Sequence, residues 1–139
     1  MAETVRDVMT ENPTTVEASA TLREAAQCMQ REDIGNVLVV ENGEVQGIVT
    51  DRDIVVRGIA KGEDPNDASV REVASTDLET LSPDDSVDDA VKRLEQGDVR
   101  RLPVVEDGKP VGIVSLGDLA EQKDRDSALA DISSAQPNN

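Results

Sequence analysis

The sequence predicts an α/β (α+β) fold built from two β-α-β-β-α repeats. The first observation is an internal repeat, because residues 5–54 align with residues 70–119 without a gap and 14 of those 50 positions are identical. The second is a helical spacing of apolar residues early in each copy. The third is a tight-turn dipeptide between two strand-like segments in each copy. A chain of 139 residues is long enough for two small subdomains.

Each copy opens with a short amphipathic stretch followed by a short strand. The amphipathic stretches are residues 5–9 and 70–74, and the strands are expected at residues 14–16 and 79–81. The apolar residues of these segments are Val, Leu, Met and Ala, since the chain contains no Phe, Tyr or Trp. Many small side chains must therefore cooperate to build the core.

A helix is predicted next in each copy. Thr21 and Ser86 are each followed three residues later by an acidic residue, which is the pattern of a capping box at a helix N-terminus. Apolar residues then recur at the i, i+3, i+4, i+7 spacing of one buried face. Those positions are Leu22, Ala25, Ala26 and Met29 in the first copy and Val87, Ala90, Val91 and Leu94 in the second.

A β-hairpin follows the helix in each copy. Its turn is Asn42-Gly43 in the first copy and Asp107-Gly108 in the second. These dipeptides favour a type I′ turn, because both central residues of that turn need a positive φ. The strands are expected at residues 37–40 and 45–50, and at residues 102–105 and 111–115.

A second helix closes each copy and sets the expected domain boundaries. These helices are predicted to start near Asp51 and near Gly117. Between the copies lies a segment rich in Gly, Asp, Pro and Asn, which are loop formers. The expected division is residues 1–60 for the first repeat, 61–69 for the linker, 70–122 for the second repeat, and 123–139 for a C-terminal helical extension with a frayed tail.

The charge balance limits the partners that this chain can have. It carries 30 acidic and 14 basic residues, for a formal net charge of −16. Such a surface repels nucleic acid and anionic membranes, and there are no aromatic side chains for bases to stack on. We expect neither partner. The composition resembles that of halophilic, haloarchaeal proteins in a salt-rich cytoplasm, where high salt screens carboxylate repulsion. Plain acidity is the alternative.

The sequence offers little material for catalysis. There is no His, and Cys28 is the only cysteine, so no disulfide can form within the chain. We interpret Cys28 as a packing residue rather than a nucleophile. We expect no enzyme, no catalytic residue and no metal site. The first ten residues lack an apolar signal region and no apolar run is long enough to span a membrane, so a cytoplasmic protein is expected.

One motif is typical of a binding site. Both copies read Gly-aliphatic-aliphatic-hydroxyl-x-x-Asp, in which Thr50 or Ser115 ends a strand and Asp53 or Asp118 lies in the first turn of a helix. A carboxylate there can accept two hydrogen bonds from the vicinal diol of a ribose. The helix N-terminus also offers N–H donors to an anion. The same pattern is a capping box. Recurrence does not separate the two readings, but the position after the strand favours a pocket.

With these motifs in place, the chain resembles a tandem, Bateman-type pair of CBS domains, the family named after cystathionine β-synthase. The resemblance covers residues 4–119 and also rests on residues 102–105 before Asp107-Gly108. It implies two repeats packed sheet-to-sheet with pseudo-two-fold symmetry and two ligand clefts. The implied ligands are AMP, ADP or ATP, with S-adenosylmethionine and NAD(H) as further candidates, and no cofactor. A homodimer is also implied.

The resemblance also assigns nucleotide-binding residues. Asp53 and Asp118 would bind the ribose hydroxyls, Thr50 and Ser115 would bind the ribose or the first phosphate, and Arg52 would meet phosphate. The backbone near Thr15 and Thr80 would lie against the polar edge of the base, and the remaining positions would form the walls around it. Those positions are Ile34, Asn36 and Val37 in the first copy and Arg100, Arg101, Leu102 and Pro103 in the second.

The cationic residues are distributed unequally between the copies. The first motif contains Arg52, whereas the second copy has Arg100 and Arg101 before its hairpin. The two clefts are therefore expected to differ in ligand or affinity, unless the Arg pair only balances surface charge. The function predicted is an adenosine-nucleotide-binding regulatory module, sensing energy or metabolite state, that acts on a separate effector protein. The alternative is a structural dimerisation module with vestigial clefts.

Overall fold

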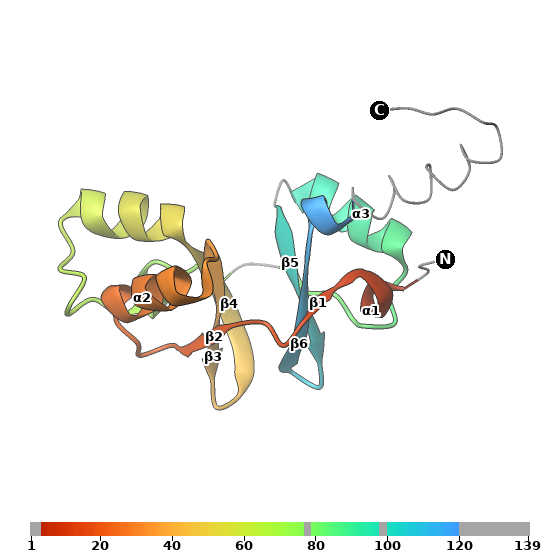
Figure 1. Cartoon of the computed structure of the whole chain (residues 1–139), viewed down its shortest axis with the longest axis horizontal. Helices are drawn as coiled ribbons and strands as arrows, with labels where there is room; N and C mark the ends of the chain where they lie inside the picture. The colour runs from red at the N-terminus through yellow and green to blue at the C-terminus, as the bar shows by residue number, and fades with distance from the viewer. Residues whose placement is uncertain (1–3, 77–78, 98–99, 120–139) are drawn as a thin grey trace. The chain divides into compact units, whose positions relative to one another are not determined.

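A computed structural model describes residues 4–76, 79–97 and 100–119, which form a mixed α/β structure with two three-stranded sheets (Figure 1). The elements in chain order are α1 (Val5–Val8), β1 (Thr10–Glu11), β2 (Thr15–Glu17), α2 (Leu22–Glu32), β3 (Asn36–Glu41), β4 (Glu44–Thr50), η1 (Asp53–Gly58), η2 (Ile59–Lys61), η3 (Val70–Glu72), α3 (Val87–Gly97), β5 (Arg101–Glu106) and β6 (Lys109–Ser115). Among these described residues, no helix combines the length and the apolar character needed to cross a membrane.

The first sheet has the strand order β2-β3-β4. β2 runs parallel to β3, and β3 pairs antiparallel with β4. Helix α2 begins where the capping box predicts, since the Glu24 N–H donates to Thr21 Oγ1 at 3.1 Å and the Thr21 N–H donates to Glu24 Oε1 at 2.9 Å. Its buried side chains pack in one core with those of the sheet. The buried face of α2 is the one that the apolar spacing predicts, with one difference. Ala26 is exposed, and Cys28 is buried instead.

The second sheet has the strand order β1-β6-β5. Its core is built from aliphatic side chains of α3 and the sheet, among them Leu94, Leu102 and Val114, together with Val5 of α1. The Asp89 N–H donates to Ser86 Oγ at 3.1 Å, as the predicted cap requires. Helix is also found at residues 116–119, where the second closing helix was expected. The predicted extension at residues 123–139 lies outside the described residues.

Both predicted hairpin turns are confirmed by their backbone angles. Asn42 and Gly43 have φ of 55° and 80°, and Asp107 and Gly108 have φ of 56° and 81°. Positive φ at both central residues is the signature of a type I′ turn. The strands on either side extend one or two residues beyond the ranges expected from the sequence.

The two compact units do not coincide with the two sequence copies. Among the described residues, one unit contains residues 12–76 and 107–110, and the other contains residues 4–11, 79–97, 100–106 and 111–119. The opening stretch of the first copy therefore belongs with the second copy, where β1 pairs antiparallel with β6. Likewise Ser75, from the opening of the second copy, bridges Ile48 of β4. The domain boundaries and the sheet-to-sheet packing expected from the sequence remain predictions.

This exchange of opening stretches between the two copies explains why both copies carry a glycine at the same aligned position. A Cβ on Gly47 would lie 2.5 Å from the carbonyl oxygen of Ser75, and a Cβ on Gly112 would collide with Met9 and approach the Thr10 carbonyl oxygen at 3.0 Å. Each glycine lies where the opening stretch of the other copy crosses the strand. The absence of a side chain is what allows the two backbones to approach.

The strand expected at residues 79–81 is reduced to a single bridge between Leu81 and Val104. In the first copy, β2 is held by the Leu38 N–H bound to the Thr14 carbonyl and by the Ala18 N–H bound to the Val40 carbonyl. The aligned residues of the second copy are Pro103 and Pro83. Proline has no backbone N–H, so neither bond has a counterpart.

The substitution Gly47→Ala tests the crossing. We expect it to lower the free energy of unfolding by about 1–3 kcal/mol, the usual cost of overpacking a close contact. Urea unfolding followed by far-UV circular dichroism measures it. Gly117→Ala is the matched control, because its Cβ would meet only Ser115 Oγ at 3.6 Å. Equal stability of the two variants would contradict the crossing contact.

Candidate functional site

The end of β4 and the start of η1 are joined by two reciprocal hydrogen bonds. The Thr50 N–H donates to Asp53 Oδ2 at 3.0 Å, and the Asp53 N–H donates to Thr50 Oγ1 at 3.0 Å. The Asp53 side chain is 17% exposed, and its Oδ1 lies 4.0 Å from Nη1 of Arg57. The carboxylate is therefore fixed by its Oδ2 and presents Oδ1 toward its surroundings.

The same arrangement recurs at the end of β6. The Ser115 N–H donates to Asp118 Oδ2 at 3.2 Å, and the Asp118 N–H donates to Ser115 Oγ at 3.0 Å. Within the part of the chain that the structure describes, Oδ1 of Asp118 has no hydrogen-bond or ion-pair partner. Each copy thus carries the same pre-set hydroxyl–carboxylate pair at a strand end.

The capping interpretation of the motif is thereby confirmed, and it leaves room for a ligand. A carboxylate offers about four acceptor positions on two oxygens, and the cap uses one oxygen. An oxygen held in place by its own carboxylate loses little further freedom when it accepts a bond from a diol. Cap and ligand acceptor are therefore compatible roles for Asp53 and Asp118.

The backbone brings other predicted residues to the same two places. Asn36 pairs with Thr50 across β3 and β4, and the Asp51 N–H donates to the Gly35 carbonyl at 3.0 Å. In the second copy the Leu116 N–H donates to the Arg100 carbonyl at 2.9 Å. The segment before each hairpin therefore lies beside the corresponding hydroxyl–carboxylate pair.

The predicted wall residues differ in accessibility. Val37 and Leu102 are only 1% and 2% exposed, because their side chains are part of the two apolar cores, and Pro103 is buried as well. Ile34 is 37% exposed, and Arg52, Arg100 and Arg101 are exposed. Side chains that fill a core offer little surface to a base, so the exposed members of the predicted wall are the ones able to reach a ligand.

The two threonines predicted beside the base lie in unlike surroundings. Thr15 starts β2 and is paired with Leu38 of β3. The carbonyl of Thr80 instead accepts a hydrogen bond from Nη1 of Arg93 at 2.7 Å. This contact was not foreseen from the sequence, because Arg93 lies on a helix 13 residues away along the chain.

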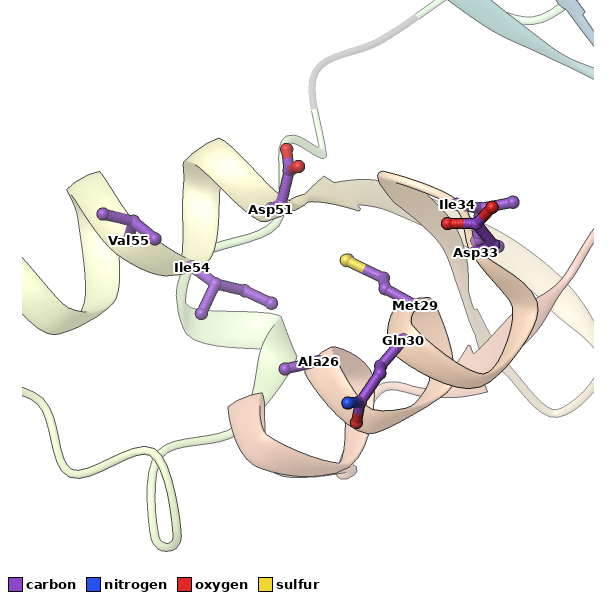
Figure 2. A pocket seen from close by; sticks show the side chains of 8 residues that line it. All are labelled: Ala26, Met29, Gln30, Asp33, Ile34, Asp51, Ile54 and Val55. Atoms are coloured by element: carbon purple, nitrogen blue, oxygen red, sulfur yellow. The ribbon is translucent and has the colours of Figure 1, made fainter.

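A pocket of about 340 Å³ lies between α2 and the start of η1 in the first unit (Figure 2). Of the predicted site residues, only Ile34 lines it. The full lining is Ala26, Met29, Gln30, Asp33, Ile34, Asp51, Ile54 and Val55. Asp51 is the residue that could have indicated this pocket from the sequence, because it differs in character from the aligned residue of the second copy, the apolar Leu116.

The described residues contain no group of three or more Cys, Asp or Glu side chains placed to hold a metal ion, and the chain has no His. Cys28 is buried in the core of the first unit, as its interpretation as a packing residue predicts. Its Sγ accepts a hydrogen bond from Nη2 of Arg31 at 3.5 Å.

Comparison with known proteins identifies the repeat. The family model described as CBS domain matches twice, at residues 5–58 and 70–124. The CBS domain-containing protein YhcV of Bacillus subtilis is 42% identical over 133 residues, covering 93% of this chain and 94% of that protein. Hypoxic response protein 1 of Mycobacterium tuberculosis is 37% identical over 118 residues, covering 84% of this chain and 82% of that protein.

Solved structures show the same architecture. The crystal structure of Hypoxic Response Protein I with two coordinated zinc ions gives a TM-score of 0.78 at 37% identity, covering 86% of this chain and 98% of that one. The CBS domain pair of protein MJ0100, in complex with 5′-methylthioadenosine and S-adenosyl-L-methionine, gives 0.80 at 24% identity over 91% and 99% of the two chains. At that identity the likeness shows the fold alone.

The sequence prediction of a haloarchaeal source finds no support in these comparisons. The matching relatives include bacterial, archaeal and yeast proteins, and the two described above come from Bacillus and Mycobacterium. Two family matches that together span most of the chain, and a relative 42% identical over nearly its whole length, establish what the repeat is. The chain belongs to the CBS domain family and carries two copies of that domain in tandem.

Proposed function

We propose that this CBS pair binds adenosine-type nucleotides at its two hydroxyl–carboxylate pairs and transmits their presence to a separate effector protein. The observation that carries the proposal is the repeated cap. Asp53 and Asp118 each bind a backbone N–H through Oδ2, which leaves Oδ1 as the acceptor for a ligand. The proposed ligands are AMP, ADP or ATP, with S-adenosylmethionine and NAD(H) as further candidates.

The chemistry of the pair supports a ribose rather than a bare anion. A carboxylate repels phosphate but accepts strong, charge-assisted hydrogen bonds from hydroxyl groups. The vicinal hydroxyls of a ribose supply two such donors next to each other, as in dinucleotide-binding folds. Thr50 or Ser115, each already bound to the helix by its own hydroxyl, would lie beside the sugar and its first phosphate.

The two copies are proposed to prefer different ligands. Beside the second pair, Arg100 and Arg101 are exposed and can bind phosphate oxygens. Beside the first pair, the matching positions are Gly35 and Asn36, and the carboxylate of Asp51 is close to Gly35. Arg52 is the one arginine within the first motif, so more phosphate groups should strengthen binding more in the second copy than in the first.

The module is proposed to regulate rather than to catalyse. A ligand shifts a conformational equilibrium only by its difference in affinity between two states. The exchange of opening stretches supplies a physical route, because Thr10 of β1 and Thr15 of β2 are five residues apart but belong to different units. The output is then read by a separate protein, and we propose no reaction for this chain itself.

Replacement of the carboxylate tests the nucleotide site. Asp118→Asn keeps an oxygen that can accept the Ser115 N–H, so the helix cap is retained while the charge is lost. We expect the affinity for the nucleotide bound in that copy to fall about tenfold or more, since hydrogen bonds to charged groups contribute about 1.5–3 kcal/mol. Calorimetric titration in molar KCl with AMP, ADP, ATP, S-adenosylmethionine and NADH measures it, because high salt screens the net charge of −16.

Two further variants complete that experiment. Asp53→Asn is expected to weaken binding in the first copy only. Asp84→Asn removes the same charge from an exposed position and should leave every affinity unchanged. Unchanged binding in both site variants, or equal losses in Asp84→Asn, would refute the proposed site. Thermal unfolding of each variant shows that the fold is retained.

The arginine pair yields a prediction about phosphate. In Arg100→Gln/Arg101→Gln, we expect ATP affinity to fall by about three- to tenfold more than adenosine affinity, because exposed charges in molar salt contribute modestly. The same calorimetry with both ligands gives the ratio. The control is Arg23→Gln in the other unit, whose guanidinium donates to Asn66 Oδ1 at 3.0 Å. An equal loss of affinity for ATP and for adenosine would show that the arginine pair does not bind phosphate.

A second candidate function has one observation in its favour. Val55, Val56 and Ile59 are exposed along η1 and η2, which is an apolar surface of the kind that joins protein chains. The chain would then be a homodimerisation module with vestigial clefts. Sedimentation showing a concentration-dependent dimer, combined with no heat from any ligand of the panel, would favour this function over the first.

A further inference from the structure

The pocket between α2 and η1 is a separate feature from the two nucleotide sites. Thr50 and Asp53 do not line it. On η1 and the residue before its N-cap, the lining positions are Asp51, Ile54 and Val55, which share one face by their i, i+3, i+4 spacing. Asp53 lies two residues from Asp51 and faces elsewhere. A ligand in this pocket would therefore not use the hydroxyl–carboxylate pair.

The floor of the pocket is apolar. Met29 of α2 and Ile54 of η1 are 6% and 7% exposed and belong to the core of the unit. Ile34 and Val55 are 37% and 58% exposed, so apolar surface continues outward to the rim. Figure 2 shows Met29 of α2 and Ile54 of η1 on the two sides of the space between these helices, with Ile34 and Val55 farther out at opposite ends. A volume of about 340 Å³ is at the lower end of the roughly 300–1,000 Å³ range of small-molecule sites.

The polar groups of the pocket are one amide and two carboxylates. Gln30 supplies the amide, and Asp33 and Asp51 supply the carboxylates. Asp51 Oδ1 accepts the Arg52 N–H at 2.8 Å, whereas its Oδ2 lies 3.3 Å from the position of a Cβ on Gly35. The lining contains no Lys or Arg, and no ion pair involves either carboxylate among the described residues. The pocket therefore combines an apolar floor with two negative charges that lack a counter-ion.

Of the two carboxylates, that of Asp51 is particular to the first copy, whereas Asp33 has an aspartate at the matching position of the second copy. The second copy has Leu116 where the first has Asp51, so the repeated fold does not require an acid at this position. The neighbouring residues change in step. Gly35, which leaves room beside the Asp51 carboxylate, is replaced by Arg100 beside Leu116. A general excess of acidic residues would not explain the matched change of these two neighbours.

We propose that this pocket binds a small organic cation, an ammonium group carried on a short apolar chain. The apolar chain would lie on Met29 and Ile54, and the ammonium group would donate charge-assisted hydrogen bonds to Asp33 and Asp51. Burial of the chain supplies affinity, and the carboxylates select positive charge over neutral or anionic ligands. A phosphorylated ligand is excluded by the same two carboxylates.

The test uses n-butylammonium as the probe and n-butanol as its neutral counterpart of similar shape. Methyl NMR of the whole chain in molar KCl follows Met29, Ile34, Ile54 and Val55 during titration with each compound. We expect saturable shifts of these methyl groups, with at least threefold weaker binding of the alcohol. In molar salt the Debye length is about 3 Å, so only contact with the carboxylates can produce that difference.

Three variants make the result decisive. Asp51→Asn is expected to weaken butylammonium binding at least threefold while leaving the alcohol unchanged. Asp51→Leu carries the residue that the second copy has at this position and should abolish the preference for the cation. Asp67→Asn removes the same charge from an exposed site in the same unit and should change nothing.

The proposal is overturned if the four methyl groups show no saturable shift, if alcohol and ammonium bind equally, or if Asp67→Asn weakens binding as much as Asp51→Asn. The outcome does not depend on nucleotide binding, because the probe carries no ribose or phosphate and the signals come from residues outside the hydroxyl–carboxylate pairs. Success or failure here can thus be separated from success or failure of the nucleotide proposal.

Discussion

The pair of reciprocal hydrogen bonds at each strand end is the interaction on which the rest of this structure depends. Thr50 with Asp53, and Ser115 with Asp118, end a strand and start a helix within four residues. The bonds satisfy N–H groups that a strand end and a helix start would otherwise leave without partners. They also fix the carboxylate before any ligand arrives. In the proposed function, a residue needed for folding is thereby also held for binding, with one oxygen for each role.

The exchange of opening stretches is the second constraint, and it makes the two copies interdependent. Gly47 and Gly112 are identical in the repeat because each lies under a backbone contributed by the other copy. A single copy taken alone would lack the segment that completes its sheet edge. The organisation of the compact units therefore requires segments from both copies, and the identity of these glycines is a packing requirement.

The local elements could be predicted from the sequence, whereas their partners could not. Capping boxes, apolar spacing and Asn-Gly or Asp-Gly turns are local signals, and α2, α3 and both hairpins follow them. The crossing of β1 onto β6 depends on residues about 100 positions apart, which no local pattern reports. The loss of the strand near Leu81 could not be predicted, because the effect of Pro83 and Pro103 depends on which backbone N–H groups pair in the sheet. The hydroxyl–carboxylate pairs could be predicted, because a hydroxyl and a carboxylate recur at a fixed spacing after a strand in both copies. The pocket beside Met29 was missed, because its apolar residues cannot be told from core residues in the sequence.

A single comparison can test the proposal that the carboxylate oxygen left free by each cap binds the vicinal diol of a ribose. Calorimetric titration in molar KCl with ATP and with its 2′,3′-dideoxy analogue measures that contribution, because the two differ only in the two hydroxyl groups. We expect ATP to bind about tenfold or more tightly than the dideoxy form, because hydrogen bonds to a charged group contribute about 1.5–3 kcal/mol. Equal affinity for the two would show that the carboxylates are helix caps and nothing more.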